Sequence, residues 1–482
     1  MTKEFAVDSA SVSGPDKVLA VDLDRTLIKT DMLEEAVFMY LKKRPWALFN
    51  VIFALLKGRV HLKNFLASAV TINPQLLPYN EKVLDRIKSA RENGYHVVLV
   101  SASHASFVKP IADHVGLFDH FIGTKDKNIK GSAKLDTLKS LYPKAKIEYL
   151  GDSSADIVLW KGFGTAHTVN ASRSSIASLK SANIPVEVID DTRKLNLKII
   201  RKSLRAHQWV KNFLVLLPLL LAHAWQQDLW TVSLLAFVSF SFTASSIYIL
   251  NDLFDLEADR AHKKKRLRPF ASGDLSISQG VILYALVSIL AIVFALLINV
   301  GFLTCLLIYF IANLTYTLRL KQVHSLDIIM LAGMYTIRIM AGSQATGIEV
   351  SEWLIGFSTF LFYGLAALKR YVEVSSLGAA QKAAGRGYIG DDKFTLAALG
   401  CASSLMACLV LALYFNSTAV LDLYRNPKLL WLILPLHLYW VSSVWILASR
   451  GKIDDDPVLH TIKSKSTYVL AALAGIVIYF AV

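Results

Sequence analysis

Cysteine is scarce in this chain, and its positions argue against a disulfide-stapled fold. Cys305, Cys401 and Cys408 are the only cysteines among 482 residues, and all three lie within apolar runs. Cys401 and Cys408 fall on one predicted helix, so they cannot bridge each other. None of the paired spacings that hold a zinc ion is present. We therefore expect neither disulfides nor a metal–thiolate centre.

The chain also lacks an apolar segment at its start. Residues 1–16 are largely polar and hold no hydrophobic stretch of the kind that a secretory signal carries. We expect no secretory signal, and we interpret these residues as a flexible tail. An internal repeat of the type common in transporters is lacking as well, which favours an enzyme over a carrier.

Hydrophobic residues make up 54% of the chain but are distributed unevenly. The first 200 residues have the pattern of a soluble domain, whereas the rest contains repeated apolar runs near the ~20 residues that span a bilayer. The sequence therefore predicts an α/β domain over 17–200 and an all-α polytopic membrane bundle over 201–482. About nine transmembrane helices are expected, near residues 212–225, 229–250, 277–299, 301–318, 325–346, 352–373, 394–415, 429–449 and 465–481.

The formal net charge of +15 is better explained by a membrane than by nucleic acid. Lysine and arginine gather in the loops 251–275, 319–324 and 369–393 and again after residue 449, while the alternate loops hold few cations. Cytoplasmic loops of membrane proteins carry this excess. We expect a multi-pass protein of the inner membrane whose N-terminal domain and cationic loops are cytoplasmic.

Polar residues follow three buried-strand patterns in the first half of the chain. These patterns cover residues 17–21, 96–100 and 146–150. Segments with helical character alternate with them, near 79–93, 105–115 and 131–142. Such alternation predicts a parallel sheet, and ligands bind where the carboxyl ends of its strands meet. That edge would gather five polar side chains: Asp22, Asp24, Ser101, Asp152 and Asp156.

This set of side chains suits phosphoester chemistry. A carboxylate such as Asp22 can attack phosphorus and form an aspartyl-phosphate. Asp24, two residues on, points the same way from an extended chain and can act as general acid and then as base. A Mg²⁺ ion held by further carboxylates neutralises the phosphoryl oxygens, and a lysine and a hydroxyl can bind them too.

In its motif order the first half resembles the haloacid dehalogenase (HAD) phosphohydrolases, a superfamily with an α/β Rossmann-like fold and a helical cap. Four motifs appear in order over roughly residues 17–170. The resemblance implies that Asp22 is the nucleophile and Asp24 the acid/base. It further implies that Ser101 and Lys134 bind the phosphate, with Lys127 and Lys130 as neighbouring alternatives to the lysine. By the same resemblance, Mg²⁺ is held by Asp22, Asp24, Asp152 and Asp156.

A helical cap is expected over about residues 31–78, between the first two motifs. Within it, residues 45–56 form an apolar run of ~12 residues, which is too short to span a bilayer. We interpret the run as the core of the cap. Alternatively it is a patch that rests on the membrane interface and lets a phosphatase reach a lipid-borne phosphate.

The second half of the chain is organised around the acidic stretch at 251–259. If the preceding apolar run continues as a helix, Asn251, Asp255 and Asp259 fall at i, i+4 and i+8, with Asp252 beside them. A stripe of carboxylates repels itself unless a divalent cation is present. Mg²⁺ prefers carboxylate oxygens together with phosphate oxygens, and the basic residues that follow suit a diphosphate.

Charged residues within predicted spans are costly and therefore usually functional. Asp327 and Arg338 lie on one face of the predicted span 325–346. The other candidates lie near the ends of spans, on the side predicted to be cytoplasmic: Lys211, Asn212, Lys321, Lys369 and Arg370.

This half resembles the UbiA superfamily of integral-membrane transferases over essentially all of residues 203–482. The motif that carries the resemblance is Asn251-Asp252-x-x-Asp255-x-x-x-Asp259. The resemblance implies that Asp252, Asp255, Asp259 and Asp327 are catalytic and that Asn251 joins the first three in holding Mg²⁺. The implied diphosphate-binding residues are Lys211, Asn212, Asn251, Arg260, His262, Lys265, Arg266, Arg268, Lys321, Arg338, Lys369 and Arg370.

Within that superfamily the flanking motifs look most like the decaprenyl-phosphate phosphoribosyltransferase branch. The aromatic prenyltransferases usually carry a second Asp-rich motif, but here Asp327 stands nearly alone and Arg338 faces the same way. The branch implies phosphoribosyl diphosphate as donor and a polyprenyl phosphate as acceptor, with a HAD-like phosphatase removing the 5-phosphate of the product. The alternative is transfer of a polyprenyl group from its diphosphate to an aromatic acid, with the phosphatase serving a separate substrate.

Overall fold

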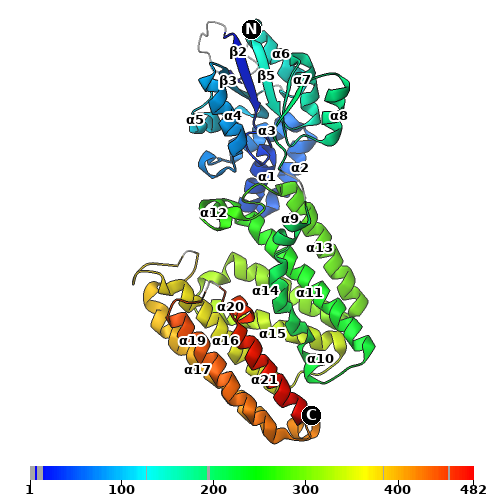
Figure 1. The fold of residues 1–482 in the computed structure, drawn as a ribbon, viewed down its shortest axis with the longest axis vertical. Coiled ribbons are helices and arrows are strands. Elements are labelled where there is room, and N and C mark those ends of the chain that lie inside the picture. The colour runs from blue at the N-terminus through cyan, green and yellow to red at the C-terminus, as the bar shows by residue number, and fades with distance from the viewer. Residues whose placement is uncertain (1–5, 8–14, 126–127, 193–195, 384, 454–455) are drawn as a thin grey trace. The chain divides into compact units, whose positions relative to one another are not determined.

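The computed structural model describes residues 6–7, 15–125, 128–192, 196–383, 385–453 and 456–482 (Figure 1). Two compact units are present. The first combines residues 1–204 with 249–284, and the second combines 205–248 with 285–482. The acidic stretch therefore folds with the N-terminal half of the chain rather than with the remaining membrane helices.

The first unit is built on a seven-stranded sheet with the order β1-β4-β3-β2-β5-β6-β7. Strand β2 (Lys17–Asp22) is central, and it pairs in parallel with β3 (His96–His104) and with β5 (Lys146–Gly151). The chain reverses its direction of winding at β2, and such a point is where parallel sheets bind ligands. The outer strands are β1 (Ala6–Val7), β4 (His120–Thr124), β6 (Ala166–Val169) and β7 (Val186–Asp190).

Strand β1 lies in the segment that was predicted as a tail, where it pairs antiparallel with β4. The three predicted strands are present, each extended by one to four residues at its carboxyl end. The predicted helices correspond to α4 (Glu81–Glu92), α5 (Ala105–Val115) and α6 (Ser132–Leu141).

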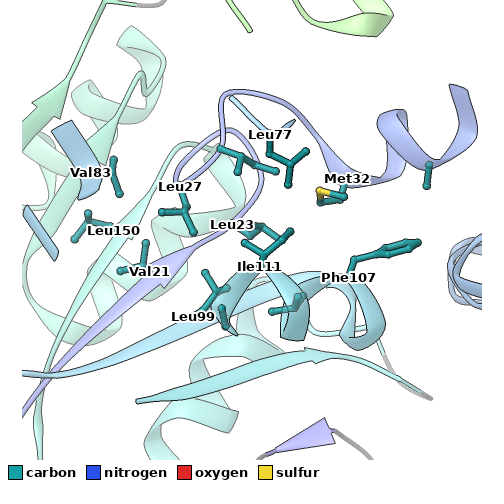
Figure 2. Close-up of a cluster of buried hydrophobic side chains, with 14 of the residues drawn as sticks. Val21, Leu23, Leu27, Met32, Leu77, Val83, Leu99, Phe107, Ile111 and Leu150 are labelled. Atoms are coloured by element: carbon teal, nitrogen blue, oxygen red, sulfur yellow. The ribbon is translucent and has the colours of Figure 1, made fainter. Parts of the chain in front are cut away.

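Side chains of β2 alternate between two cores, one on each face of the sheet. Leu19 and Val21 pack with α4 and α5, whereas Val18 and Ala20 face α6, α7 (Ile157–Phe163) and α8 (Arg173–Ser181). Figure 1 shows these two groups of helices on opposite sides of the strands. Figure 2 shows part of the first core, in which Val21 and Leu99 of neighbouring strands meet Ile111 of α5. Because both faces are covered, β2 has a continuous apolar sequence.

Three helices follow β2 in the region where the sequence predicts a helical cap, and we refer to them as the cap. It consists of α1 (Met32–Lys43), α2 (Leu48–Leu56) and α3 (Arg59–Ala69). Asp31 is the N-cap of α1, because its carboxylate accepts hydrogen bonds from the backbone N–H groups of Leu33 and Glu34. Met32 and Leu77, at either end of the cap, both join the core drawn in Figure 2.

Among the described residues, six helices are long and apolar enough to cross a membrane, not nine. They cover Gln227–Phe254 (α11), Ile277–Ile298 (α13), Val300–Leu318 (α14), Leu326–Thr346 (α15), Gly390–Phe415 (with α17) and Pro427–Ser449 (with α19). The predicted first and last spans are apolar helices that are shorter, Ala206–Leu221 and Lys465–Ala481. The predicted span 352–373 is α16 (Glu352–Ser375), which has the length but carries four charged residues. Each of the nine predicted spans thus corresponds to an apolar helix, but only six of these helices in the described part of the chain are long and apolar enough to span a membrane.

Candidate functional site

A cavity of about 240 Å³ opens at the carboxyl edge of the sheet, where β2, β3 and β5 end. Asp22 is the last residue of β2, and Asp152 and Asp156 follow β5. Each of these three side chains offers an oxygen, and the three oxygens lie within 4.8 Å of one another. In the described part of the chain, this is the only such group of acidic, histidine or cysteine side chains.

The close grouping of these three carboxylates favours a bound cation. Burial, and then the charges of Asp22 and Asp156, raise the pKa of Asp152 to about 8. Burial also raises the pKa of Asp22 to about 7, against the opposing effect of Lys134. Hard oxygen ligands that gather in a buried site are a set that Mg²⁺ suits. Asp22, Asp152 and Asp156 therefore fit the metal that the sequence predicted, and Asp24 does not join their group.

Lys134 lies beside the predicted nucleophile. Its Nζ donates to Asp22 Oδ1 over 2.7 Å and to Tyr149 Oη over 2.8 Å, and the tyrosine in turn donates to Asp156 Oδ1. Although burial alone would lower the pKa of Lys134, the carboxylates of Asp22 and Asp156 raise it. The lysine is therefore held as a cation where a phosphoryl oxygen would bind.

Asp24 is fixed by three donors. Its Oδ1 accepts from the backbone N–H of Met32 over 2.7 Å, and its Oδ2 accepts from the hydroxyls of Ser101 and Ser103 over 3.0 and 2.8 Å. Ser103, which the sequence analysis did not single out, lines the cavity, whereas Ser101 is fully buried behind it. Ser101 and Ser103 are two residues apart on β3, so both hydroxyls lie on one face of the sheet. This spacing could have identified Ser103 as a second hydroxyl beside Asp24.

The cap also contributes to the cavity. Lys63 of α3 reaches the sheet, where its Nζ donates to the carbonyl of Ala102 and to Asn128 Oδ1 over 2.5 and 2.7 Å. Lys63 and Arg59 both line the cavity. The sequence did not identify these two residues as part of the site, because an arginine and a lysine four residues apart are common on exposed helix surfaces.

The acidic stretch forms the end of α11 and the short helix α12 (Leu256–Ala261). Asp255 lies at the junction of the two helices. Its backbone N–H donates to the carbonyl of Asn251, and its backbone carbonyl accepts from the N–H of Asp259. The predicted one-turn spacing is therefore kept. Arg268 Nη1 donates to Asp252 Oδ1 over 3.1 Å and to Asp259 Oδ2 over 2.6 Å, so one predicted diphosphate ligand lies against two of the carboxylates.

The remaining basic residues of this loop lie in different environments. Lys265 and Arg266 are exposed in a short 3₁₀ turn, and His262 accepts the backbone N–H groups of Lys264 and Lys265 through Nδ1. Arg260 points elsewhere. Its guanidinium donates to both carboxylate oxygens of Glu35 in the cap helix α1, over 2.6 and 3.2 Å.

We expect the Arg260–Glu35 pair to be important for stability. Both side chains are almost fully buried, at 6% and 3% exposure, and Thr30 also donates to the glutamate. Removing one partner of a buried ion pair leaves the other charge uncompensated, which costs about 3 to 5 kcal/mol. Glu35→Gln should therefore lower the thermal midpoint of the purified chain measurably, whereas Glu81→Gln, an exposed carboxylate of α4, should not. If the double variant Glu35→Gln/Arg260→Gln is as destabilised as the sum of the single variants, the two residues are not coupled.

The second unit holds the polar residues that were predicted within spans. Asp327 is fully buried, and its Oδ1 accepts from Tyr316 Oη over 2.8 Å. Arg370 and Arg386 donate to the same carboxylate. Asp327 is thus surrounded by two guanidinium groups. The sequence analysis proposed Arg370 but did not include Tyr316 or Arg386 in the site.

Arg338 lies on the same helix as Asp327 but has its own partners. It donates to Asn212 Oδ1 over 3.0 Å and to Tyr309 Oη over 2.9 Å, and its guanidinium stacks on the Tyr335 ring at 5.3 Å from the centroid. Lys211 Nζ pairs with Asp456 over 2.5 Å. Lys321 and Lys369 are half-buried, in the turn before α15 and beside Arg370 respectively.

An apolar cavity of about 460 Å³ lies between α14, α15 and α16 in the second unit. Its lining includes Cys305, Ile329, Ala332, Thr336 and Met340. A cavity of this size and polarity suits part of a hydrocarbon chain.

Comparison with known proteins matches both halves of the chain. The profile of the UbiA prenyltransferase family matches residues 212–464, and that of the haloacid dehalogenase-like hydrolases matches residues 47–160. The uncharacterized protein y4nM of Sinorhizobium fredii is 35% identical over 463 residues, which cover 94% of this chain and 89% of the relative.

Two further relatives match parts of the chain. The decaprenyl-phosphate phosphoribosyltransferase of Corynebacterium glutamicum is 38% identical over 178 residues, which cover 36% of this chain and 54% of that enzyme. A solved UbiA homolog from Archaeoglobus fulgidus, bound to GPP and Mg²⁺, is 18% identical with a TM-score of 0.45, over 58% of this chain and 99% of the homolog. From the family match over residues 212–464 and the candidate spans, the chain is an integral membrane protein that belongs to the UbiA prenyltransferase family and carries a haloacid dehalogenase-like domain at its N-terminus.

Proposed function

We propose that the chain is a bifunctional membrane enzyme that makes a polyprenyl-phosphate ribose for cell-envelope glycans. The membrane part transfers phosphoribose from phosphoribosyl diphosphate to a polyprenyl phosphate, and the N-terminal domain then removes the 5-phosphate. One observation carries this proposal. A segment 38% identical to a decaprenyl-phosphate phosphoribosyltransferase is joined in one chain to a cavity that holds Asp22 against Lys134.

In the transfer step, an oxygen of the acceptor phosphate attacks the anomeric carbon of the donor, and the bond to diphosphate breaks. Arg268 would stabilise the departing diphosphate, and its position against Asp252 and Asp259 of the acidic stretch supports this role. Asn251, Asp252, Asp255 and Asp259 offer the oxygens that would hold Mg²⁺, which supplies positive charge to the leaving group when bound.

The environment of Asp327 favours this donor over a prenyl diphosphate. A second Asp-rich motif would supply carboxylates for another metal ion. Here Asp327 pairs with Arg370 and Arg386, which also pair with Glu373, and it accepts the hydroxyl of Tyr316. Because both carboxylates are already paired with guanidinium groups, the cluster leaves no uncompensated negative charge for a second divalent cation.

In the second step, a carboxylate oxygen of Asp22 attacks phosphorus and forms an aspartyl-phosphate, while the ribose oxygen leaves with a proton from Asp24. Asp24 then takes a proton from the water that hydrolyses this intermediate, and inorganic phosphate is released. Lys134 binds a phosphoryl oxygen throughout. Asp22, Asp152 and Asp156 would hold Mg²⁺, which neutralises charge on the phosphoryl group when bound.

The proposal is tested by offering two pairs of substrates to the purified chain in nanodiscs. Phosphoribosyl diphosphate with polyprenyl phosphate should give a lipid-linked ribose, detected by mass spectrometry, together with diphosphate and phosphate. Chelation of Mg²⁺ with EDTA should stop both steps, and added Mg²⁺ should restore them. A prenylated product from polyprenyl diphosphate and an aromatic acid, with no lipid-linked ribose from the first pair, would refute the proposal.

A further inference from the structure

The cap helix α2 exposes an apolar surface that a soluble domain would normally bury. Val51 and Ala54 pack into the core of the cap. The rest of the helix is apolar but exposed, with Trp46 just before it at 87%, Phe49 at 78% and Leu56 at 80%. A continuous exposed surface of this kind marks a site of contact with a membrane or another molecule.

Cations lie at both ends of this surface. Lys42, Lys43 and Arg44 precede it, Lys57 and Arg59 follow it, and all five are exposed. A helix with an apolar face and flanking lysine and arginine residues is typical of segments that lie in the interface of a bilayer with anionic lipids. A second apolar protein surface would have no need of these charges.

The first unit connects the cap to the end of a candidate span. Glu34 of α1 accepts hydrogen bonds from the backbone N–H and the hydroxyl of Ser278, over 3.1 and 2.9 Å. Ser278 lies in the first turn of α13, which is the most apolar of the six candidate spans. Phe38 of α1 also meets Phe254 of α11, with 5.6 Å between ring centroids. A cap attached to the ends of two such helices is held near the surface of the bilayer.

The exposed surface also leads directly to the phosphatase cavity. Helix α3 begins at Arg59, three residues after α2 ends, and Arg59 and Lys63 both line the cavity that contains Asp22. A phosphoester that approaches along α2 would therefore meet these two cations before it reached the nucleophile.

We propose that α2, with Trp46, lies in the interface of the bilayer and that the phosphatase takes a phosphoester carried by a lipid in preference to a soluble sugar phosphate. This inference rests on the proposed function and specifies how its second substrate is delivered. It identifies the bilayer itself as the partner of the apolar surface.

Docking is measured directly by fluorescence in nanodiscs of phosphatidylethanolamine and phosphatidylglycerol. The contribution of Trp46 is the difference between the natural chain and its Trp46→Phe variant. Acyl chains that carry bromine should quench this difference signal, whereas unbrominated lipids should not. An unquenched signal overturns the inference. If the surface is instead covered by a second copy of the chain, Phe49→Ser would lower the mass of the assembly and Trp46 would remain unquenched.

Delivery is measured by comparing two substrates of the phosphatase. Trp46→Ser/Phe49→Ser should slow hydrolysis of polyprenyl-phosphate-linked ribose 5-phosphate by roughly tenfold or more. Hydrolysis of ribose 5-phosphate in water should be unchanged, which also shows that the variant is folded. Val158→Ser, which alters an exposed apolar residue of α7, serves as the matched control and should affect neither substrate.

Equal slowing of both substrates by the double variant would overturn the delivery inference. A natural chain that hydrolyses neither substrate would instead count against the proposed function, and the quenching measurement would still decide whether α2 docks.

Discussion

Asp22→Asn should abolish phosphate release while transfer continues, so that lipid-linked ribose bearing its 5-phosphate accumulates. The variant replaces the nucleophilic carboxylate by an amide of the same size, and loss of a covalent nucleophile lowers the rate by at least roughly a thousandfold. Mass spectrometry of the lipid product separates the two species, because they differ by one phosphate. The result expected for the natural chain is the dephosphorylated lipid alone.

The matched control is Asp85→Asn, which changes an exposed carboxylate of α4 that pairs only with Lys88 in the described structure. It should leave both products as in the natural chain. If Asp22→Asn still releases phosphate at the natural rate, Asp22 is not the nucleophile. If it stops transfer as well, the two steps are not separate reactions at separate sites.

Asp255→Asn should reduce phosphoribosyl transfer by about a hundredfold or more, because the substitution removes a charge that would hold Mg²⁺ at the departing diphosphate. Asp255 is half-buried at the junction of α11 and α12, one turn from both Asn251 and Asp259. Hydrolysis of a preformed 5-phosphorylated lipid by the N-terminal domain should be unaffected. Initial rates of diphosphate release at several Mg²⁺ concentrations measure the effect.

Glu257→Gln provides the comparison, because it removes a neighbouring carboxylate of α12 that lies off the row formed by residues 251, 255 and 259. It should change transfer less than about threefold, as expected of a half-buried charge that lies outside the site. If the two variants lost transfer activity equally, the total negative charge of the acidic stretch would determine the rate, and not the spacing of residues 251, 255 and 259.

Much of the first unit was predictable, because local rules determine it. A continuous apolar run located β2, and the position of Asp22 at its end followed from the parallel sheet. The cap helices were predicted only as a region, since Lys63 reaches Ala102 across 39 residues of sequence and no periodicity records such a contact. Likewise, the approach of Arg370 and Arg386 to Asp327 depends on how three separate segments pack.

The role of Arg260 could not be deduced from its neighbours in the sequence. It stands in a run of basic residues that suits a diphosphate, yet its guanidinium is held by Glu35, 225 positions earlier. The number of membrane spans was also difficult to predict from the sequence, because it depends on where each helix begins and ends. The first and last apolar helices are shorter than a span, and α16 includes four charged residues.

The folding of the acidic stretch with the N-terminal half bears on whether the two activities can be genetically separated. A gene divided near residue 204 would leave α12 and the start of α13 without Glu34 and Glu35, although both activities would keep their own motifs. Co-expression of the two fragments should then restore function only if they reassociate. We therefore expect the two halves of the gene to be exchanged together between genomes and not separately.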